Sequence, residues 1–313
     1  MSIAFVFPGQ GSQAVSMGAG LAEAFPAAKA VFDEVDDALA QKLSTLMWEG
    51  PEADLTLTEN AQPALMAVSL AAMRALETKG FTLPGNVAYV AGHSLGEYSA
   101  LAASGALSLA DTARLLKTRG QAMQAAVPVG EGAMAALLGA DLSQAQELAE
   151  AAAEDECCQA ANDNAPGQVV ISGKKTAIER AVALAPKFGA RRAVLLPVSA
   201  PFHCALMQPA ADAMAEALSG VTISEPAVPV VANVLAEPIT DPEAIRARLV
   251  EQVTGMVRWR ETMQFLAGNG VDAVYEVGAG RVLTGMARRL EGVEARSVGT
   301  PEELESAAAA LNG

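Results

Sequence analysis

A serine between two glycines is the first feature of this sequence that could do chemistry. The run Gly-His-Ser-Leu-Gly at 92–96 follows a short apolar stretch, 87–91, and precedes a helix-like stretch that begins at Leu95. A serine on a sharp strand-to-helix turn is held out of the sheet, and flanking glycines leave room for the turn. The next backbone N–H then lies at a helix N-terminus, where it can bind an oxyanion. We therefore predict that Ser94 is a nucleophile, although the five-residue pattern alone also fits a helix cap.

A serine hydroxyl is a weak nucleophile near neutral pH and needs a base within hydrogen-bond reach. The chain has only two histidines. His93 is adjacent to Ser94, and in an extended turn its side chain should point roughly the other way. His203 lies where the chain leaves a predicted small domain, at the mouth of the predicted cleft. A lone histidine is usually structural, but this position makes His203 the predicted base.

Arg119 shares the apolar face of a predicted helix over 109–127. It lies three residues after Leu116 and four before Met123, so it points inward with them. An inward arginine needs an anionic partner, because an unpaired buried charge costs several kcal/mol. That partner is either a structural carboxylate, such as Glu97 or Asp111, or a substrate carboxylate that matches the planar guanidinium. The spacing leaves both possibilities open.

Two glycines occur in the turn after the first predicted strand, 3–7. The run Pro-Gly-Gln-Gly-Ser-Gln at 8–13 lets the backbone approach a ligand closely. In a parallel sheet this turn lies at the same edge as Ser94. It lacks the Gly-Lys-Ser/Thr ending of a phosphate-binding loop. We therefore expect it beside the site but not on a nucleotide phosphate.

Strands and helices alternate through most of the chain, which predicts an α/β fold with a largely parallel sheet covered on both faces. The predicted strands are 3–7, 87–91, 228–232 and 273–277, and the main helices are 60–79, 109–127 and 241–253.

The middle of the chain has a different order of elements. Residues 133–196 predict the order β-α-β-β-α-β, which is the ferredoxin-like unit. Proline- and glycine-containing segments at 128–130 and 197–201 flank it and read as hinges. We predict a small domain, 129–198, inserted into a large domain made of 1–128 and 199–313. Such an insertion creates a cleft in which a ligand can bind.

Composition excludes several classes of protein. With 313 residues, 51% of them hydrophobic, the chain can bury a large core, and no window approaches the ~20 apolar residues of a membrane-spanning helix. The net charge of −15 disfavours binding to nucleic acid or anionic membranes. Three cysteines, at 157, 158 and 204, match neither a disulfide framework nor a zinc site. We expect a cytoplasmic monomer without a metal or redox cofactor.

Taken together, the motifs resemble those of the malonyl-CoA:acyl-carrier-protein transacylases of fatty-acid synthesis. The runs that carry the resemblance span nearly the whole chain and are Phe7–Gln13, Gly92–Tyr98, Arg119-Gly120, Asn164–Gln168 and Phe202-His203-Cys204. The resemblance implies an α/β-hydrolase-like large domain with a ferredoxin-like insertion. It also implies malonyl-CoA and an acyl carrier protein as the substrates.

The resemblance implies further roles for single residues. Ser94 would be acylated, His203 would be its base, and Arg119 would hold the free carboxylate of malonate. Gln10 and the Leu95 N–H would form the oxyanion hole. Gln252 would lie beside the histidine, and its region would supply a carbonyl that orients the ring. After Gln252 the family usually has a proline before Val-Arg-Trp, which this chain lacks.

An acidic carrier must find local positive charge on this acidic chain. Two arginine pairs, Arg191-Arg192 and Arg288-Arg289, are the obvious places to look. We predict that Arg191 and Arg192 belong to the carrier-docking surface or hold coenzyme A phosphates.

Three other functions remain open at this point. A serine esterase or thioesterase would use Ser94 and His203 but would not need an inward Arg119. A transacylase that serves a polyketide synthase would carry the same motifs. A non-catalytic carrier-binding protein would not need the serine turn and the histidine together.

Overall fold

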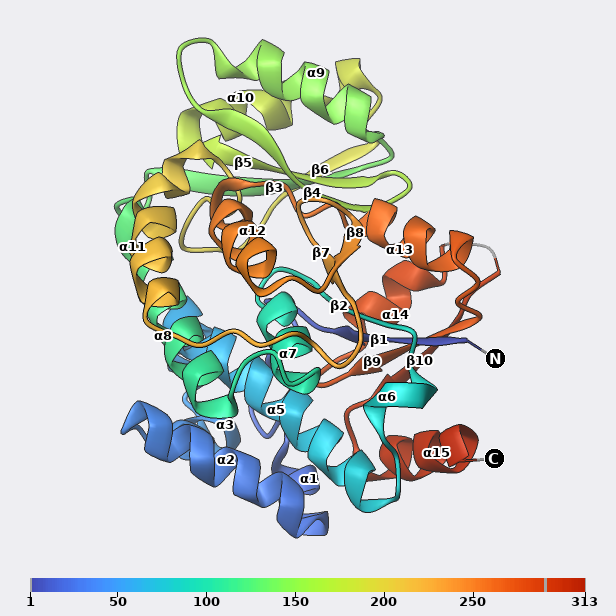
Figure 1. Ribbon diagram of the computed structural model, residues 1–313. Coiled ribbons are helices and arrows are strands. Elements are labelled where there is room, and N and C mark those ends of the chain that lie inside the picture. Colours follow the sequence, from blue (N-terminus) through green and yellow to red (C-terminus); the bar gives the residue numbers. More distant parts are fainter. Residues whose placement is uncertain (1, 290–291, 313) are drawn as a thin grey trace.

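Two sheets organise the computed structural model, which describes residues 2–289 and 292–312 (Figure 1). The large sheet has the strand order β10-β9-β1-β2-β7-β8, and the small sheet has the order β4-β5-β3-β6. The strands of the large sheet are β1 (Ile3–Phe7), β2 (Tyr89–Gly92), β7 (Val230–Ala232), β8 (Glu237–Ile239), β9 (Ala273–Val277) and β10 (Glu294–Val298). The strands of the small sheet are β3 (Gly132–Leu138), β4 (Cys158–Ala165), β5 (Gln168–Lys174) and β6 (Arg192–Leu195).

The helices lie around these sheets and are named in chain order. They are α1 (Ala19–Ala24), α2 (Pro26–Leu39), α3 (Leu43–Glu49), α4 (Glu52–Thr56), α5 (Thr58–Thr78), α6 (Leu83–Asn86), α7 (Gly96–Ala103), α8 (Leu109–Ala126), α9 (Leu142–Ala153), α10 (Lys175–Leu184), α11 (Gln208–Ser219), α12 (Pro242–Thr254), α13 (Trp259–Gly268), α14 (Val282–Ala287) and α15 (Pro301–Asn312). Two 3-10 turns, Ala185–Phe188 and Ala205–Met207, precede β6 and α11. No helix in the described part of the chain is long and apolar enough to cross a membrane.

The large sheet is buried on both faces, as a parallel sheet requires. Phe5 and Phe7 of β1 point into a core shared with α2 and α5. Ala4 and Val6 point the other way, into a core shared with α13 and α14. All neighbouring strands are parallel except the β7–β8 hairpin. The predicted mixed α/β fold with a mainly parallel sheet is therefore confirmed.

The small sheet is antiparallel and carries its own apolar core against α9 and α10. Figure 1 shows it at the top of the molecule, with both helices on its outer face. Its elements follow in the order β3-α9-β4-β5-α10-β6. The last helix, α10, ends at Leu184, and the 3-10 turn Ala185–Phe188 continues directly from it.

Close packing at the end of β2 explains the two glycines around the serine. A Cβ on Gly92 would lie 1.9 Å from the carbonyl carbon of Gly96, and one on Gly96 would lie 2.2 Å from the Phe7 oxygen. Side chains at these positions would force the start of α7 away from β1 and β2. The glycines therefore allow α7 to begin directly over the carboxyl ends of the two central strands.

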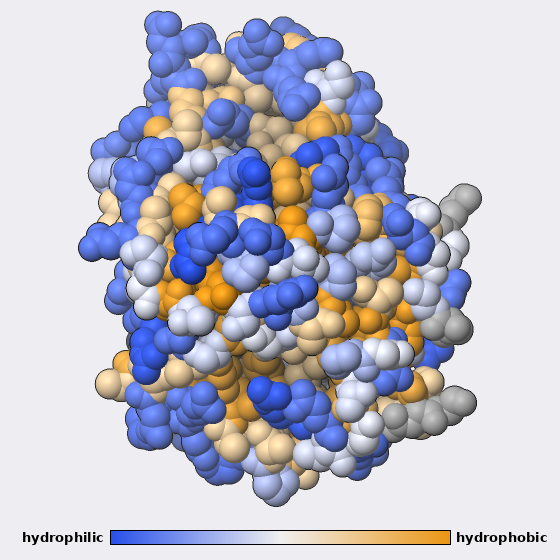
Figure 2. All heavy atoms as spheres, viewed as in Figure 1, coloured by the Kyte–Doolittle hydropathy of each residue, from blue (hydrophilic) through white to orange (hydrophobic). Residues whose placement is uncertain are grey.

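Hydrophilic residues cover most of the face shown in Figure 2, and hydrophobic residues appear mainly across its middle. The residues predicted to do chemistry lie in a cleft of about 460 Å³. Residues of β3, β4 and β5 line one side of it, and the turns after β1 and β2 line another.

Candidate active site

Ser94 and His203 meet at the bottom of the cleft. The Ser94 Oγ lies 2.8 Å from His203 Nε2. Both residues have a left-handed backbone conformation, with φ of 54° at Ser94 and 58° at His203. Residues other than glycine rarely adopt this conformation and are strained in it, and such strain clusters at functional sites. The two side chains that the sequence selected thus lie within hydrogen-bond distance although they are 109 residues apart.

Two backbone carbonyls fix the orientation of the histidine ring. His203 Nδ1 lies 2.9 Å from the Gln252 oxygen and 3.1 Å from the Gly255 oxygen. Carbonyls only accept, so Nδ1 carries the proton and Nε2 is left to accept the serine proton. Both oxygens lie at the C-terminus of α12, where carbonyls lack a partner within the helix and the dipole is negative. This helix end therefore favours a positive charge on His203.

Burial keeps His203 neutral in the absence of substrate. Its pKa falls to about 3, because the ring is desolvated and Arg119 lies nearby, although the two carbonyls oppose the shift. A neutral imidazole is the form that can accept a proton from Ser94. The resting site is thus ready for proton transfer at neutral pH.

Arg119 is 1% exposed and makes no hydrogen bond to a carboxylate among the described residues. Its Nη1 donates to Gln62 Oε1 at 2.7 Å, and its Nη2 donates to Gln252 Oε1 at 2.8 Å and to Ser94 Oγ at 3.1 Å. The guanidinium also lies over the Tyr98 ring, 5.7 Å from its centre. All of these partners are neutral, so the charge remains available to an anion in the cleft.

Neither carboxylate that the sequence offered as a structural partner binds Arg119 directly. Asp111 is at the far end of α8 and pairs with Arg114. Glu97 is buried, but its Oε2 accepts from Gln252 Nε2 at 2.6 Å and not from Arg119. Gln252 therefore stands between the two charges. Its Nε2 also donates to the Ser94 carbonyl at 3.0 Å, so this one amide touches the serine, the arginine and the glutamate.

Gln10 lines the cleft at the end of a directed chain of hydrogen bonds. Gln62 accepts from Arg119 through Oε1 and donates through Nε2 to Thr58 Oγ1 at 2.9 Å. Thr58 Oγ1 then donates to Gln10 Oε1 at 3.0 Å. Because the Gln10 oxygen is occupied, its amide nitrogen is left as a donor toward the cleft. The chain of contacts thus links the arginine to the orientation of Gln10.

Leu95 comes directly after the serine, ahead of the first residue of α7. Its N–H finds no acceptor among the residues that the structure describes. Helix N-termini leave such N–H groups free for an anion. The Leu95 N–H and the Gln10 amide therefore remain as two donors on residues that line the cleft with Ser94.

The other residues selected from the sequence are His93, which lines the cleft, and two arginine pairs, which lie outside it. His93 also lines the cleft, but its Nε2 lies 2.8 Å from Asn164 Oδ1 and its ring packs against Trp259, so it is not near the serine hydroxyl as a base. Arg191 and Arg192 are exposed at the start of the edge strand β6, outside the residues that line the cleft. Arg288 and Arg289 are exposed after α14.

Two residues were missed in the sequence. Gln62 lies in α5 and touches Arg119, and Asn233 follows β7 and touches the Ser94 backbone. The only available signal was weak: Asn233 is a polar residue directly after an apolar strand, at the edge where parallel strands present their ligands. No group of three His, Cys, Asp or Glu side chains in the described chain could hold a metal ion.

Comparison with known proteins shows which family the chain resembles. Residues 4–301 match the acyl transferase domain. The malonyl CoA-acyl carrier protein transacylase of Escherichia coli strain K12 is 46% identical over 308 residues, which cover 98% of each chain. The protein of that name from Bacillus subtilis strain 168 is 45% identical, over 97% of this chain and 96% of its own.

Solved structures agree with these relatives. The acyl-carrier-protein S-malonyltransferase of Bartonella henselae superposes with a TM-score of 0.98, at 58% identity and full coverage of both chains. A malonyl-transacylase solved in complex with a type II polyketide acyl-carrier protein superposes with a TM-score of 0.95, at 43% identity over 99% of this chain and 100% of its own.

The pH dependence of stability tests the burial of Glu97 and its contacts with Gln252 and Asn233. Burial raises its pKa to about 7, against the opposing effects of the Gln252 and Asn233 hydrogen bonds and of Arg119. A raised pKa means that the folded state binds the proton more tightly than the unfolded state. The stability from this preference is present below about pH 4.5 and is lost as pH rises to about 7.

We therefore expect the free energy of unfolding of the wild type, relative to Glu97→Gln, to fall by ~3 kcal/mol between pH 4.5 and 7.5. Urea unfolding at several pH values measures this difference. Glu23→Gln, at an exposed position on α1, is the control for loss of one carboxylate. A difference that does not change with pH would show that Glu97 is not held as described.

Proposed function

The chain belongs to the malonyl-CoA:acyl-carrier-protein transacylases of the acyl transferase family, and we propose how its residues carry out the reaction. The enzyme moves a malonyl group from malonyl-CoA to the phosphopantetheine thiol of an acyl carrier protein. The observation that carries the proposal is the buried guanidinium of Arg119, which lies against the Ser94 hydroxyl and has only neutral partners.

The first half of the reaction makes an acyl-serine. The free carboxylate of malonyl-CoA binds Arg119, which offers a planar donor pair at the bottom of the cleft. His203 Nε2 takes the proton from Ser94 as its oxygen attacks the thioester carbonyl. The Leu95 N–H and the Gln10 amide hold the oxyanion. The tetrahedral intermediate then collapses, His203 gives its proton to the sulfur, and coenzyme A leaves.

The second half reverses these steps with another thiol. The phosphopantetheine thiol gives its proton to His203 and attacks the malonyl-serine ester. Collapse releases the malonyl thioester, and the proton returns to Ser94. Each step uses only groups of this chain and its substrates, so we propose that no metal or redox cofactor takes part.

The bound carboxylate assists the base. Arg119 is one of the groups that lower the pKa of His203. A malonate carboxylate on Arg119 neutralises that positive charge and makes an imidazolium less costly. The carbonyls at the end of α12 stabilise the same cation. Binding of a carboxylated substrate therefore strengthens the base at the moment when it is needed.

For the architecture, we propose an α/β-hydrolase-like large domain, 1–128 and 199–313, with a ferredoxin-like insertion, 129–198. The order of the elements, the antiparallel small sheet and its separate apolar core support this division. Residues 1, 290–291 and 313 of the proposed large domain lie outside the described residues. The cysteines at 157, 158 and 204 are free, as is typical of a reducing compartment, and we propose a cytoplasmic location.

A polyketide synthase is the second candidate for the pathway. One structural relative is bound to a type II polyketide carrier, so the same fold serves such carriers. The chemistry at Ser94 is the same in both cases. Transfer rates to carriers of the two kinds distinguish them.

Peptide mass spectrometry after mixing the enzyme with malonyl-CoA tests the proposed function. We expect a malonyl adduct on Ser94 that disappears when a carrier with a free phosphopantetheine thiol is added. His203→Ala should slow formation of the adduct by about 10²–10⁴-fold, because a general base contributes that much. Release of free malonate without transfer would instead identify a hydrolase.

Carrier docking is tested by charge reversal. We propose that Arg191 and Arg192 bind the acidic carrier or coenzyme A phosphates, and their exposure at the start of β6 supports this. The double variant Arg191→Glu/Arg192→Glu should raise KM for the carrier by about tenfold and leave malonylation of Ser94 nearly unchanged. Lys29→Glu/Arg74→Glu, on α2 and α5, is the matched control. An unchanged KM would exclude docking on this strand.

A further inference from the structure

The side chain of Asn233 lies under the turn that carries the nucleophile. Its Oδ1 accepts a hydrogen bond from the Ser94 N–H at 2.8 Å, and its Nδ2 donates to the Gly92 carbonyl at 2.6 Å. The residue is completely buried. Strands β2 and β7 are parallel neighbours, so the residues that follow them lie side by side. One amide therefore binds the backbone of the turn at two points.

These two bonds act on a strained position. Ser94 has a φ of 54°, a left-handed conformation that is strained for residues other than glycine. Such a residue stays in place only if its surroundings hold it there. The Asn233 bonds hold the peptide groups on either side of His93, directly before the strained residue. They therefore oppose relaxation of the turn and movement of the serine oxygen.

The contact with Asn233 also makes two neighbouring N–H groups differ, because only one of them has an acceptor. The Ser94 N–H is already bound to Asn233, whereas the Leu95 N–H has no acceptor among the described residues. Only the second is thus free for an oxyanion. Asn233 also binds Glu97, because its own N–H donates to Oε2 of that side chain at 3.2 Å. The asparagine therefore joins the serine turn to the Glu97–Gln252 contact.

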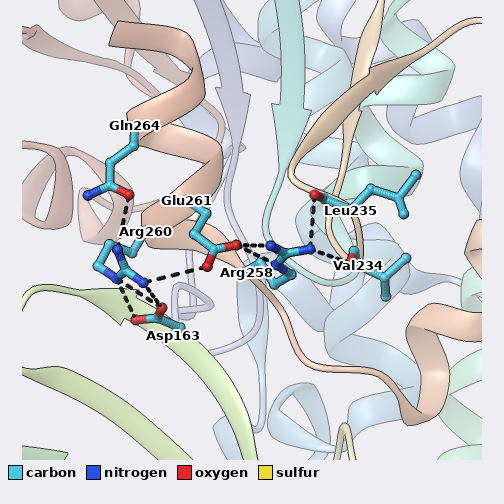
Figure 3. A network of polar contacts seen from close by, with 7 residues as sticks. All are labelled: Asp163, Val234, Leu235, Arg258, Arg260, Glu261 and Gln264. Atoms are coloured by element: carbon cyan, nitrogen blue, oxygen red, sulfur yellow. Dashed lines mark hydrogen bonds and ion pairs between the residues drawn. The ribbon is translucent and has the colours of Figure 1, made fainter. Parts of the chain in front are cut away.

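Arg258 binds the turn that contains Asn233, and Figure 3 shows its guanidinium against the carbonyls of Val234 and Leu235. Its backbone N–H donates to the Asn233 carbonyl at 3.0 Å, and its Nη1 donates to the carbonyls of Val234 at 3.3 Å and Leu235 at 3.1 Å. Its guanidinium is also paired with Glu261. The turn after β7 is therefore held through three of its carbonyls by one residue.

The network continues into the small sheet. Glu261 lies 3.6 Å from Arg260, which pairs with the buried Asp163 of β4 at 2.7 Å, as Figure 3 shows. The Asp163 N–H also donates to the Val257 carbonyl at 2.9 Å. The strand that lines the cleft is thus connected to the turn that positions the nucleophile.

We propose that Asn233 is a positioning residue for acyl transfer: it holds the Ser94 turn in its strained conformation and leaves the Leu95 N–H as the backbone donor to the oxyanion. The inference rests on the proposed function, since it concerns the same serine. Asn233 itself does not touch the substrate. Its effect should therefore appear in the rate of acylation and not in the affinity for malonyl-CoA.

Asn233→Ala removes both contacts. We expect the single-turnover rate of Ser94 malonylation to fall on the order of 100-fold, as for a misplacement of about 1 Å, with KM for malonyl-CoA nearly unchanged. Asn269→Ala is the matched control, because that side chain donates only to the Phe265 carbonyl at the exposed end of α13. A wild-type rate in Asn233→Ala would overturn the proposal.

Asn233→Asp separates positioning from a general effect on folding. A protonated carboxyl reproduces both bonds, since its carbonyl oxygen accepts from Ser94 and its hydroxyl donates to Gly92. An ionised carboxylate loses the donor and faces the Gly92 carbonyl. Burial and Glu97 raise the pKa of an aspartate at this position, whereas Arg119 and Arg258 lower it, and the buried His203 is neutral.

The single-turnover rate of Ser94 malonylation in Asn233→Asp, relative to the wild type, should therefore rise as pH falls from 8 to 5. The same folded preparation of the variant is used at each pH. A ratio that stays constant over this range would contradict positioning by hydrogen bonds. Adduct formation by the wild type distinguishes failure of the proposed function from failure of the role proposed for Asn233. If it forms no adduct on Ser94, the proposed function fails; if it forms one and Asn233→Ala matches its rate, only the role of Asn233 fails.

Discussion

The buried positive charge of Arg119 is the constraint on which the rest of the site depends. A guanidinium that is 1% exposed would be strongly destabilising without partners, and here the partners are amides and a hydroxyl. Those amides are held in turn: Gln62 by Thr58, and Gln252 by Glu97 and the Ser94 carbonyl. Folding therefore places a charge at the bottom of the cleft and orients every group around it. In the proposed reaction, a carboxylated acyl group supplies the anion that binds Arg119.

The two residues that we propose to react both have a strained backbone conformation. Ser94 and His203 both have positive φ, and each is held by groups from another part of the chain. For His203 these are the carbonyls at the end of α12, and for Ser94 the holding group is Asn233 after β7. Both supports come from the segment that lies C-terminal to the small sheet. Precise placement of the reacting atoms thus depends on long-range packing as well as on the local serine turn.

The chemistry-bearing residues could be found in the sequence because their signals are local. The glycines around Ser94 mark a turn, helical spacing points Arg119 inward, and the element order of 133–196 predicts the small sheet. Their supports could not be found in this way. The position of Asn233 directly after a strand is only a weak signal for a contact 139 residues away, and nothing near Gln62 indicates its contact 57 residues away. The segment after Gln252 also lacks the family's proline, yet α12 continues to Thr254 and its last turn still presents a carbonyl to His203.

We propose that Arg119 selects a carboxylated acyl group. The most direct measurement compares kcat/KM for malonyl-CoA and acetyl-CoA in the wild type and in Arg119→Ala. We expect a strong wild-type preference for malonyl-CoA that disappears in the variant, because kcat/KM falls much further for malonyl-CoA than for acetyl-CoA, which shares only the loss of the Arg119 hydrogen bonds to Ser94 and Gln252. The same preference in both proteins would instead make Arg119 a structural residue.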